Sequence, residues 1–423
     1  MNTQFLFHLA VALSRVWFVD AAQPQQPLPR AAAQDHAVVE VPQFKETRRI
    51  AVAAEHGAIL GFVPDGTGGL VVLSGQNLRY GSYRGQQAGG PPPDRLVWMN
   101  ATGTEQRAVV LPENPRGLNC ADDGTVYVVG NATVAWYDAT GKLLGQREAP
   151  HFSLPEEEHE AFTEEAVDRR DLSVTHQEKS LKSLEETLEA IESKPEEDRT
   201  PVEKARLNSL QQQVKYQREA LERRRSMTPQ QLFDEAVSNA KQLYRVAVSK
   251  QHVFLVGRET FGYGYAVWRC DRECQQPEKI ISGLSGCCGQ MDVQVISNQL
   301  AVAENSRHRV ILMNFDGEKT STFGQRDRSG SAAGFSGCCN PMNTCQTSDG
   351  GLLTSESNGC VKKFAVDGTF QEVVGNADVR QGCKNSSVGM SADGSRIYYL
   401  DISKGQIIVL EKQPAAPVQE DEP

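Results

Sequence analysis

The chain has 423 residues, enough for two or three average domains or for one large all-β domain with an insertion. Its formal net charge of −10 argues against nucleic acid or an anionic membrane surface as the main partner, because no basic field is present to displace counterions. Hydrophobic residues make up 39% of the chain, as in ordinary globular proteins, so a collagen-like or wholly disordered chain is excluded.

Residues 1–22 predict a signal peptide or N-terminal anchor. Residues 5–19 are mostly apolar, and the small residues around Ala21 suit a cleavage site. Against this, no Lys or Arg precedes the apolar stretch, and His8 and Arg15 interrupt it. No other segment approaches the ~18 apolar residues that a membrane helix needs. Residues 23–44, rich in Ala, Gln and Pro, predict a flexible linker.

Residues 45–153 predict two four-stranded β units, which we interpret as blades 1 and 2. Short apolar runs alternate with Gly-rich turns, and Gly supplies the positive φ that a tight reversal needs. The pattern Trp-x-x-Ala-Thr-Gly begins at Trp98 and again at Trp136, 136 − 98 = 38 residues later. Residues 50–54 predict a spare strand. We expect it to complete the last blade and so close a ring.

Residues 154–243 predict an inserted helical hairpin followed by a short helix. Apolar residues recur at coiled-coil spacing in two stripes, and Thr200-Pro201-Val202-Glu203 between them is a capping box that starts the second helix. Thr228-Pro229 starts the third, shorter helix. The rest of the surface is highly charged. Two interpretations stay open, a solvated coiled-coil arm and an arm that binds a partner or self-associates.

The tripeptide Gly-Cys-Cys occurs at residues 286–288 and again at residues 337–339, and the surrounding residues match at the same offset of 338 − 287 = 51 residues. A period of ~40–50 residues built from short strands is typical of a β-propeller. Residues 244–412 therefore predict blades 3–6, and residues 413–423 a disordered tail. The predicted fold class is all-β, a six-bladed β-propeller with an inserted α-helical hairpin.

Residues 300–313, Leu-Ala-Val-Ala-Glu-Asn-Ser-Arg-His-Arg-Val-Ile-Leu-Met, resemble an NHL repeat, in which a strand and a polar turn ending in His-Arg precede the next strand. Residues 114–118 resemble the opening half of the same repeat. The departures are weak matches in the first and third blades and Asn358-Gly359-Cys360 where His-Arg would stand. The resemblance implies a platform that binds protein, peptide or RNA, while related six-bladed rings include lactonases and lyases.

The chain has ten cysteines, nine of them between Cys270 and Cys383 inclusive, which predicts a disulfide framework in an oxidising compartment. We expect the chain to be exported to the periplasm, the cell surface or the extracellular space. Cys270 and Cys274 flank a turn and suit a disulfide. The propeller interpretation gathers most of the others, with Cys120, on one face, where the candidate binding residues are Cys287, Cys288, His308, Cys338, Cys339, Cys345, Cys360 and Cys383.

Three interpretations of this cysteine-rich face stay open. Disulfides would pin loops to their own or neighbouring blades, for instance Cys339 to Cys360. Thiolates with His308 would instead bind zinc or copper(I), although paired Cys-x-x-Cys knuckles are absent. A strained disulfide between adjacent cysteines would be redox-active, with Lys384 and Arg380 near Cys383 as the cationic surround.

Sequence motifs of hydrolases are absent, namely Gly-x-Ser-x-Gly, His-Glu-x-x-His and a phosphate-binding Gly-Lys-Ser/Thr loop. A calcium-dependent lactonase on this fold would need carboxylates and Asn facing the channel, for which Glu55, Asp292 and Asn343 are candidates. We interpret His308 as a turn residue of the repeat rather than as a metal ligand or a catalytic base. The sequence thus predicts a binding scaffold without catalytic residues, cofactor or metal and with a protein or peptide partner. The alternatives are a metal-dependent lactonase-like hydrolase and a thiol-redox protein.

Overall fold

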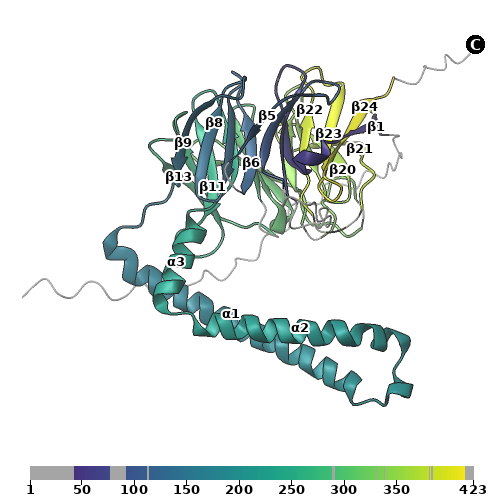
Figure 1. Cartoon of the computed structure of the whole chain (residues 1–423). Helices are drawn as coiled ribbons and strands as arrows, with labels where there is room; N and C mark the ends of the chain where they lie inside the picture. The colour runs from purple at the N-terminus through teal and green to yellow at the C-terminus, as the bar shows by residue number, and fades with distance from the viewer. Residues whose placement is uncertain are drawn as a thin grey trace, which may run out of the picture. The chain divides into compact units, whose positions relative to one another are not determined.

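The computed structural model describes residues 42–76, 92–111, 114–287, 291–329, 331–337, 339–380, 382 and 384–414. The predicted signal or anchor and most of the predicted linker and tail lie outside these residues. In the described part of the chain, the strands form four four-stranded sheets and one eight-stranded sheet (Figure 1).

Each four-stranded sheet is an antiparallel meander of strands that follow one another in the chain. The first holds β2 (Ala58–Pro64), β3 (Leu70–Gly75), β4 (Arg95–Met99) and β5 (Glu105–Val110). The second holds β6 (Pro115–Cys120), β7 (Val126–Gly130), β8 (Thr133–Tyr137) and β9 (Leu143–Glu148). The third holds β10 (Leu243–Val248), β11 (Val253–Arg258), β12 (Tyr265–Cys270) and β13 (Glu278–Leu284). The fourth holds β14 (Asp292–Ile296), β15 (Gln299–Glu304), β16 (Arg309–Met313) and β17 (Lys319–Phe323).

The eight-stranded sheet consists of two such meanders side by side. One holds β18 (Asn343–Gln346), β19 (Leu352–Ser355), β20 (Cys360–Phe364) and β21 (Phe370–Asn376). The other holds β22 (Val388–Met390), β23 (Arg396–Asp401), β24 (Gln406–Lys412) and, as its outermost strand, β1 (Phe44–Ile50). A single bridge from Phe44 to Gly375 joins β1 to β21 and makes the two meanders one sheet.

The meanders form a closed ring, because their first strands contact one another in the cyclic order β2, β6, β10, β14, β18, β22 and back to β2. Apolar clusters fill the junctions between successive meanders. Leu73 and Leu118, for example, belong to one cluster, and Phe254 and Val302 to another. Four-stranded meanders arranged in a ring around their first strands constitute a β-propeller, so the predicted fold class is confirmed at this level.

The ring is closed by the N-terminal strand, but that strand lies earlier than predicted. β1 spans Phe44–Ile50 and pairs antiparallel with β24, whereas residues 50–54 were expected to form it. Three consecutive side chains after Phe44 are exposed, because an outermost strand has only one packed face. This polar composition is what made the start of the strand resemble a linker.

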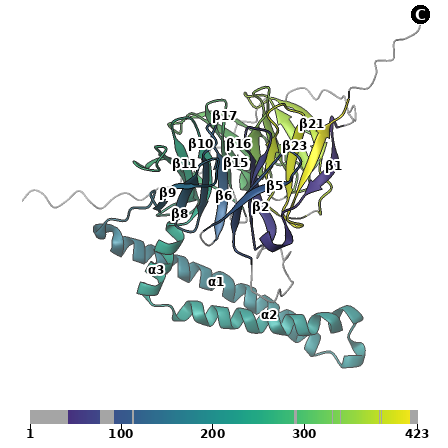
Figure 2. The same ribbon diagram turned by 45° about the horizontal axis from the view of Figure 1, so that its top comes forward.

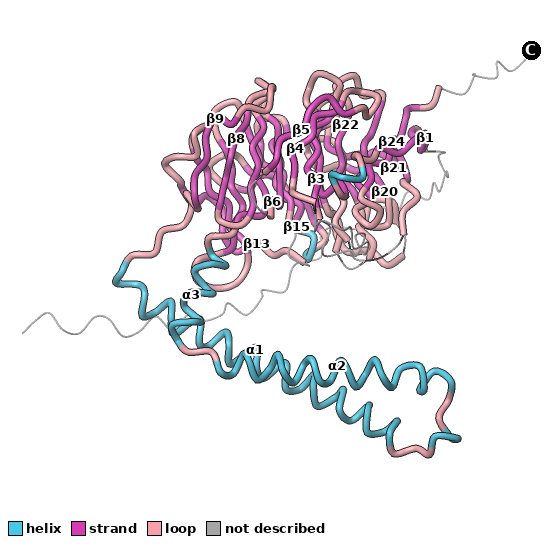
Figure 3. Tube along the Cα trace, in the orientation of Figure 1, coloured by secondary structure: helices cyan, strands magenta, loops and turns pink. Residues whose placement is uncertain are grey.

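The insertion after β9 contains α1 (His159–Glu192), α2 (Pro201–Ser226) and α3 (Pro229–Ala240) (Figure 3), and β10 follows α3 in the chain. α1 and α2 pack along each other as an antiparallel hairpin (Figure 2), with Leu181, Val214 and Leu221 buried in the seam. Capping boxes at Thr200 and Thr228 start α2 and α3. Within the described residues, no helix combines the length and apolarity that a membrane crossing requires.

Candidate binding face and channel

In an antiparallel meander, the loop before the first strand and the turn between the second and third strands lie at the same side of the ring. We use the name loop face for one side of the fourth sheet and of the β18–β21 meander. This side carries residues 285–287, 304–308, 336–337, 339–342 and 356–360. The side chains that organise it are buried acids and amides at the ends of the second strands.

Glu304, the last residue of β15, holds the loop before β14. Its side chain is fully buried. Its Oε1 accepts a hydrogen bond from the backbone N–H of Ser285 at 2.9 Å, and its Oε2 accepts one from Arg309 Nε at 2.6 Å. A buried carboxylate is stable only when it is paired and hydrogen-bonded in this way, so the loop and the acid fix each other.

Glu356 does the same one meander further on. Its Oε2 accepts hydrogen bonds from the backbone N–H of Ser336 at 3.0 Å and from the Ser336 hydroxyl at 2.9 Å. The Lys362 ammonium forms an ion pair with the same carboxylate, and both side chains are buried. Neither acid stands out in the sequence, because an acidic residue beside polar turn residues is usually solvated. The 51-residue repeat aligns Glu304 with Ser355 and so does not align the two acids.

Amide and imidazole side chains continue these contacts across the junction between the two meanders. Asn305 Oδ1 accepts a hydrogen bond from the backbone N–H of Cys287 at 2.8 Å, and its Nδ2 lies 3.7 Å from Met342 Sδ. His308 adopts a left-handed conformation with φ 55, and its Nε2 lies 3.2 Å from the Gly337 carbonyl oxygen. The candidate His308 is therefore a buried turn residue that holds the next loop.

Two of the candidate cysteines meet at this junction. The Sγ atoms of Cys287 and Cys339 lie 2.7 Å apart. Cys360 is half-buried at the start of β20. The pKa of its thiol is raised to about 12, mainly by burial and to a smaller extent by the nearby Glu356 carboxylate. The other cysteines predicted for this face, Cys288, Cys338 and Cys383, lie outside the described residues.

Two other cysteines lie away from the loop face, contrary to the expectation that they would gather there with the rest. Cys345 is the third residue of β18, in the wall of the channel. Cys120 ends β6, next to the turn between β6 and β7, which is at the opposite side of the ring. Burial raises the pKa of both thiols, that of Cys120 to about 12. Both are therefore protonated near neutral pH and poor nucleophiles.

The centre of the ring contains a polar cavity of about 210 Å³ lined by the first strands. Asp292 and Asn343, proposed from the sequence as channel residues, line it, whereas Glu55 lies in a short 3-10 helix (Ala54–His56) away from it. Arg116 and Arg245 also line it, and no motif in the sequence marks them as channel residues.

The acid in the channel is satisfied by its neighbours. Asp292 is fully buried, and one of its oxygens accepts a hydrogen bond from the Thr344 N–H at 3.1 Å. Burial raises the pKa of Asp292, an effect that the nearby Arg245 guanidinium partly opposes. In the described part of the chain, no three His, Cys, Asp or Glu side chains are arranged to hold a metal ion.

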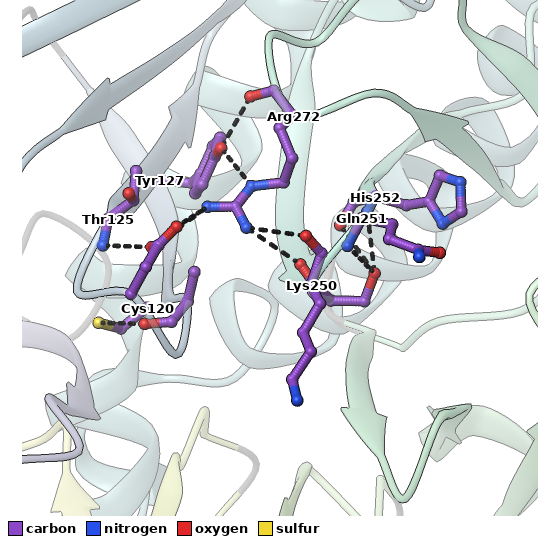
Figure 4. Close-up of polar contacts among 10 residues, drawn as sticks. Cys120, Thr125, Tyr127, Lys250, Gln251, His252 and Arg272 are labelled. Carbon is purple, nitrogen blue, oxygen red and sulfur yellow. Dashed lines mark hydrogen bonds and ion pairs between the residues drawn. The ribbon is translucent and has the colours of Figure 1, made fainter.

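On the opposite side of the ring, an arginine joins the second and third sheets (Figure 4). Arg272 lies in the turn after β12, and its guanidinium donates to Asp123 Oδ2 at 2.9 Å and to the Tyr127 hydroxyl at 2.9 Å. The Tyr127 hydroxyl in turn donates to the Arg272 carbonyl at 2.7 Å. The same guanidinium reaches the carbonyls of Ser249 and Lys250. One side chain thus fixes three turns.

Cys270 and Cys274 flank this turn, but the predicted disulfide between them is not formed in the structure. Both are present as thiols, buried in the apolar cluster between the second and third sheets. Burial raises the pKa of the Cys270 thiol to about 12 and that of Cys274 further. The spacing of Cys270 and Cys274 predicted a turn closed by a disulfide. Instead, the hydrogen bonds of Arg272 and the packing of the two sulfurs stabilise the turn.

No protein-family model matches the chain, and no curated protein matches it. Solved structures do match. One of them is the β-propeller domain of Cps50 (Swd1) from Myceliophteria thermophila, which is 8% identical with a TM-score of 0.42 over 88% of this chain and 100% of that one. The resemblance to NHL repeats remains a prediction, and the chain is assigned to no family.

Proposed function

We propose that this chain is an exported, non-catalytic, six-bladed β-propeller that binds a protein or peptide partner through its loop face and its helical arm. The sixth blade in this proposal consists of β22, β23, β24 and β1, which closes the ring. Export is supported by the number of cysteines and by the apolar residues 5–19.

The observation that carries the proposal is the place of the insertion. α1, α2 and α3 lie between β9 and β10, in the position of the loop that precedes a first strand, and this loop belongs to the same side of the ring as the loop face. The base of the arm is fixed there, because Glu165 Oε1 accepts the Gly262 N–H at 2.7 Å and Phe162 packs on Phe261. A partner at this side would contact the loops and the arm together.

The loops are also suited to binding because they are already ordered. Buried Glu304 and Glu356 and the amide of Asn305 fix the backbone of the loops before a partner arrives. Little conformational entropy is then lost on docking, which favours affinity. The apolar seam of the arm is filled by its own two helices, so the arm offers a partner mainly its charged outer faces.

Site-specific photo-cross-linking tests which side of the ring binds. Arg307 and Asp316 are exposed charged residues that precede and follow the same strand, β16, and therefore lie at opposite sides of the ring. We would place a photoreactive amino acid at either position in the full chain and irradiate it in its own compartment. The matched variant at Asp316 controls for random collisions.

We expect a discrete adduct with the Arg307 variant and none with the Asp316 variant. An adduct formed only from Asp316, or from neither position, would contradict binding at the loop face. Deletion of residues 159–226, with a short linker between the flanking residues, should weaken the Arg307 adduct if the arm contributes to the same site.

A further inference from the structure

We infer that Cys287 and Cys339 form a disulfide bond that joins the loops of two neighbouring meanders. The link would tie the loop before β14 to the loop before β18, across the junction that the proposed partner would cover. The proposed disulfide joins these two residues and no others. It rests on the proposed function in one respect, because the bond persists only in an oxidising compartment.

The first support is the position of the two sulfurs. The Sγ atoms lie 2.7 Å apart, whereas a disulfide bond measures about 2.05 Å, so closing the bond requires a movement of less than an ångström. The residues are 339 − 287 = 52 positions apart in the chain, and they come from equivalent loops of successive repeats. The closeness is therefore a product of the fold and not of sequence neighbourhood.

The second support is that hydrogen bonds hold the backbone near both sulfurs, and residues 305–308 contact both loops. Asn305 receives the backbone N–H of Cys287, and His308, three residues later, contacts the carbonyl of Gly337 in the other loop. On the Cys339 side, Asn340 Oδ1 receives the N–H of Ser357 at 2.8 Å. These contacts fix the two loops against each other whether or not the sulfurs are bonded, so little order has to be created when the bond forms.

The chemistry is thiol–disulfide exchange with a small disulfide such as oxidised glutathione. Cys287 is half-buried and Cys339 is buried, so the Cys287 thiolate attacks first, breaking the disulfide of the oxidant and releasing one reduced glutathione. The Cys339 sulfur then attacks Sγ of the mixed disulfide at Cys287 and displaces the second glutathione. The two cysteines lose two electrons, and their two protons end on the two glutathione thiols.

Peptide mapping of the full chain tests the pairing. Trypsin cleaves after Lys279 and Arg307, and after Arg328 and Lys362, so the disulfide would link peptide 280–307 to peptide 329–362. The chain is reduced, treated with oxidised glutathione, blocked with N-ethylmaleimide and digested. Because each peptide holds more than one cysteine, the mapping is done in a Cys288→Ser, Cys338→Ser background.

In that background we expect the linked peptide pair to form. Adding Cys339→Ser should abolish it, whereas the controls Cys345→Ser and Cys360→Ser should leave it unchanged. Closing a loop of this length should also raise the Tm of the oxidised chain by roughly 5 °C over the reduced chain, and the Cys287→Ser variant, altered at a half-buried position, should lose this difference.

A linked pair that persists after Cys339→Ser would overturn the assignment, because Cys287 would then be bonded to Cys345 or Cys360 of peptide 329–362. So would a chain that stops at glutathionylated Cys287 without forming the link. Both results would leave the binding proposal standing, since the photo-cross-link at residue 307 reports on the partner without reference to the sulfurs.

Discussion

His151 is a buried side chain that makes the stability of the propeller depend on pH. The residue follows β9, where the ring passes into the insertion, and its Nε2 lies 3.1 Å from the Ala240 carbonyl oxygen at the end of α3. Its imidazole packs edge-on against the Trp268 side chain, with the two ring centroids 4.8 Å apart. Burial lowers the pKa of His151 from 6.5 to about 4, so the imidazole is neutral at physiological pH.

We therefore predict that the free energy of unfolding falls as the pH drops from about 6.5 to about 4, because in this window the unfolded chain binds a proton that the folded chain refuses. A shift of this size corresponds to about 3 kcal/mol at most. His151→Gln keeps a donor toward Ala240 but cannot titrate, so it should lose this part of the pH dependence.

The measurement is urea unfolding of both proteins at a series of pH values, compared as a difference so that other titrating groups cancel. The control is His176→Gln, which removes an exposed histidine of α1 and should keep the original slope. If His151→Gln retained the full pH dependence, the buried imidazole would not be its source.

At the scale of elements, the helical hairpin depends on a narrow seam. Val214 and Leu221 of α2 are buried against Leu181 of α1, while Arg218 and Arg225 pair with Glu185 and Glu178 across the antiparallel helices. Exposed ion pairs of this kind contribute little. The seam must therefore supply most of the stability of the arm.

We predict that Val214→Asp separates α1 from α2, because it places an unpaired charge in the seam at a cost of about 3 kcal/mol or more. Circular dichroism at 222 nm should lose the signal of these helices, and limited proteolysis should cut within residues 159–226. Tyr216→Asp, two positions away and 68% exposed, is the matched control and should leave both readouts unchanged. An intact helical signal in Val214→Asp would show that the seam does not hold the hairpin.

The elements differ in how well the sequence predicts them. The hairpin was predictable down to its capping box at Thr200, because coiled-coil spacing and cap chemistry are local signals. β1 was misplaced, because an outermost strand draws its stability from pairing with β24, which lies more than 350 positions away. Its local composition therefore carries almost no signal, and only Phe44 and Ile50 are buried.

At the scale of the whole molecule, the repeat predicted the ring but not what organises its faces. The 51-residue match between the Gly-Cys-Cys loops located equivalent strands and brought Cys287 and Cys339 to one junction. It could not distinguish Cys345, which faces the channel, from the cysteines of the loop face. It also gave no sign that Glu304 and Glu356 are buried, since burial depends on loops that fold back over them.

The proposed binding mode requires that the loop face is ordered before any partner binds. Residue-resolved hydrogen–deuterium exchange on the isolated chain tests it through the backbone amides of Ser285, Cys287 and Ser336, which donate to the side chains of Glu304, Asn305 and Glu356. We predict that these three amides exchange as slowly as the amides within β15 and β19. Exchange of these amides at the rate of an unprotected chain would contradict the preorganised binding face.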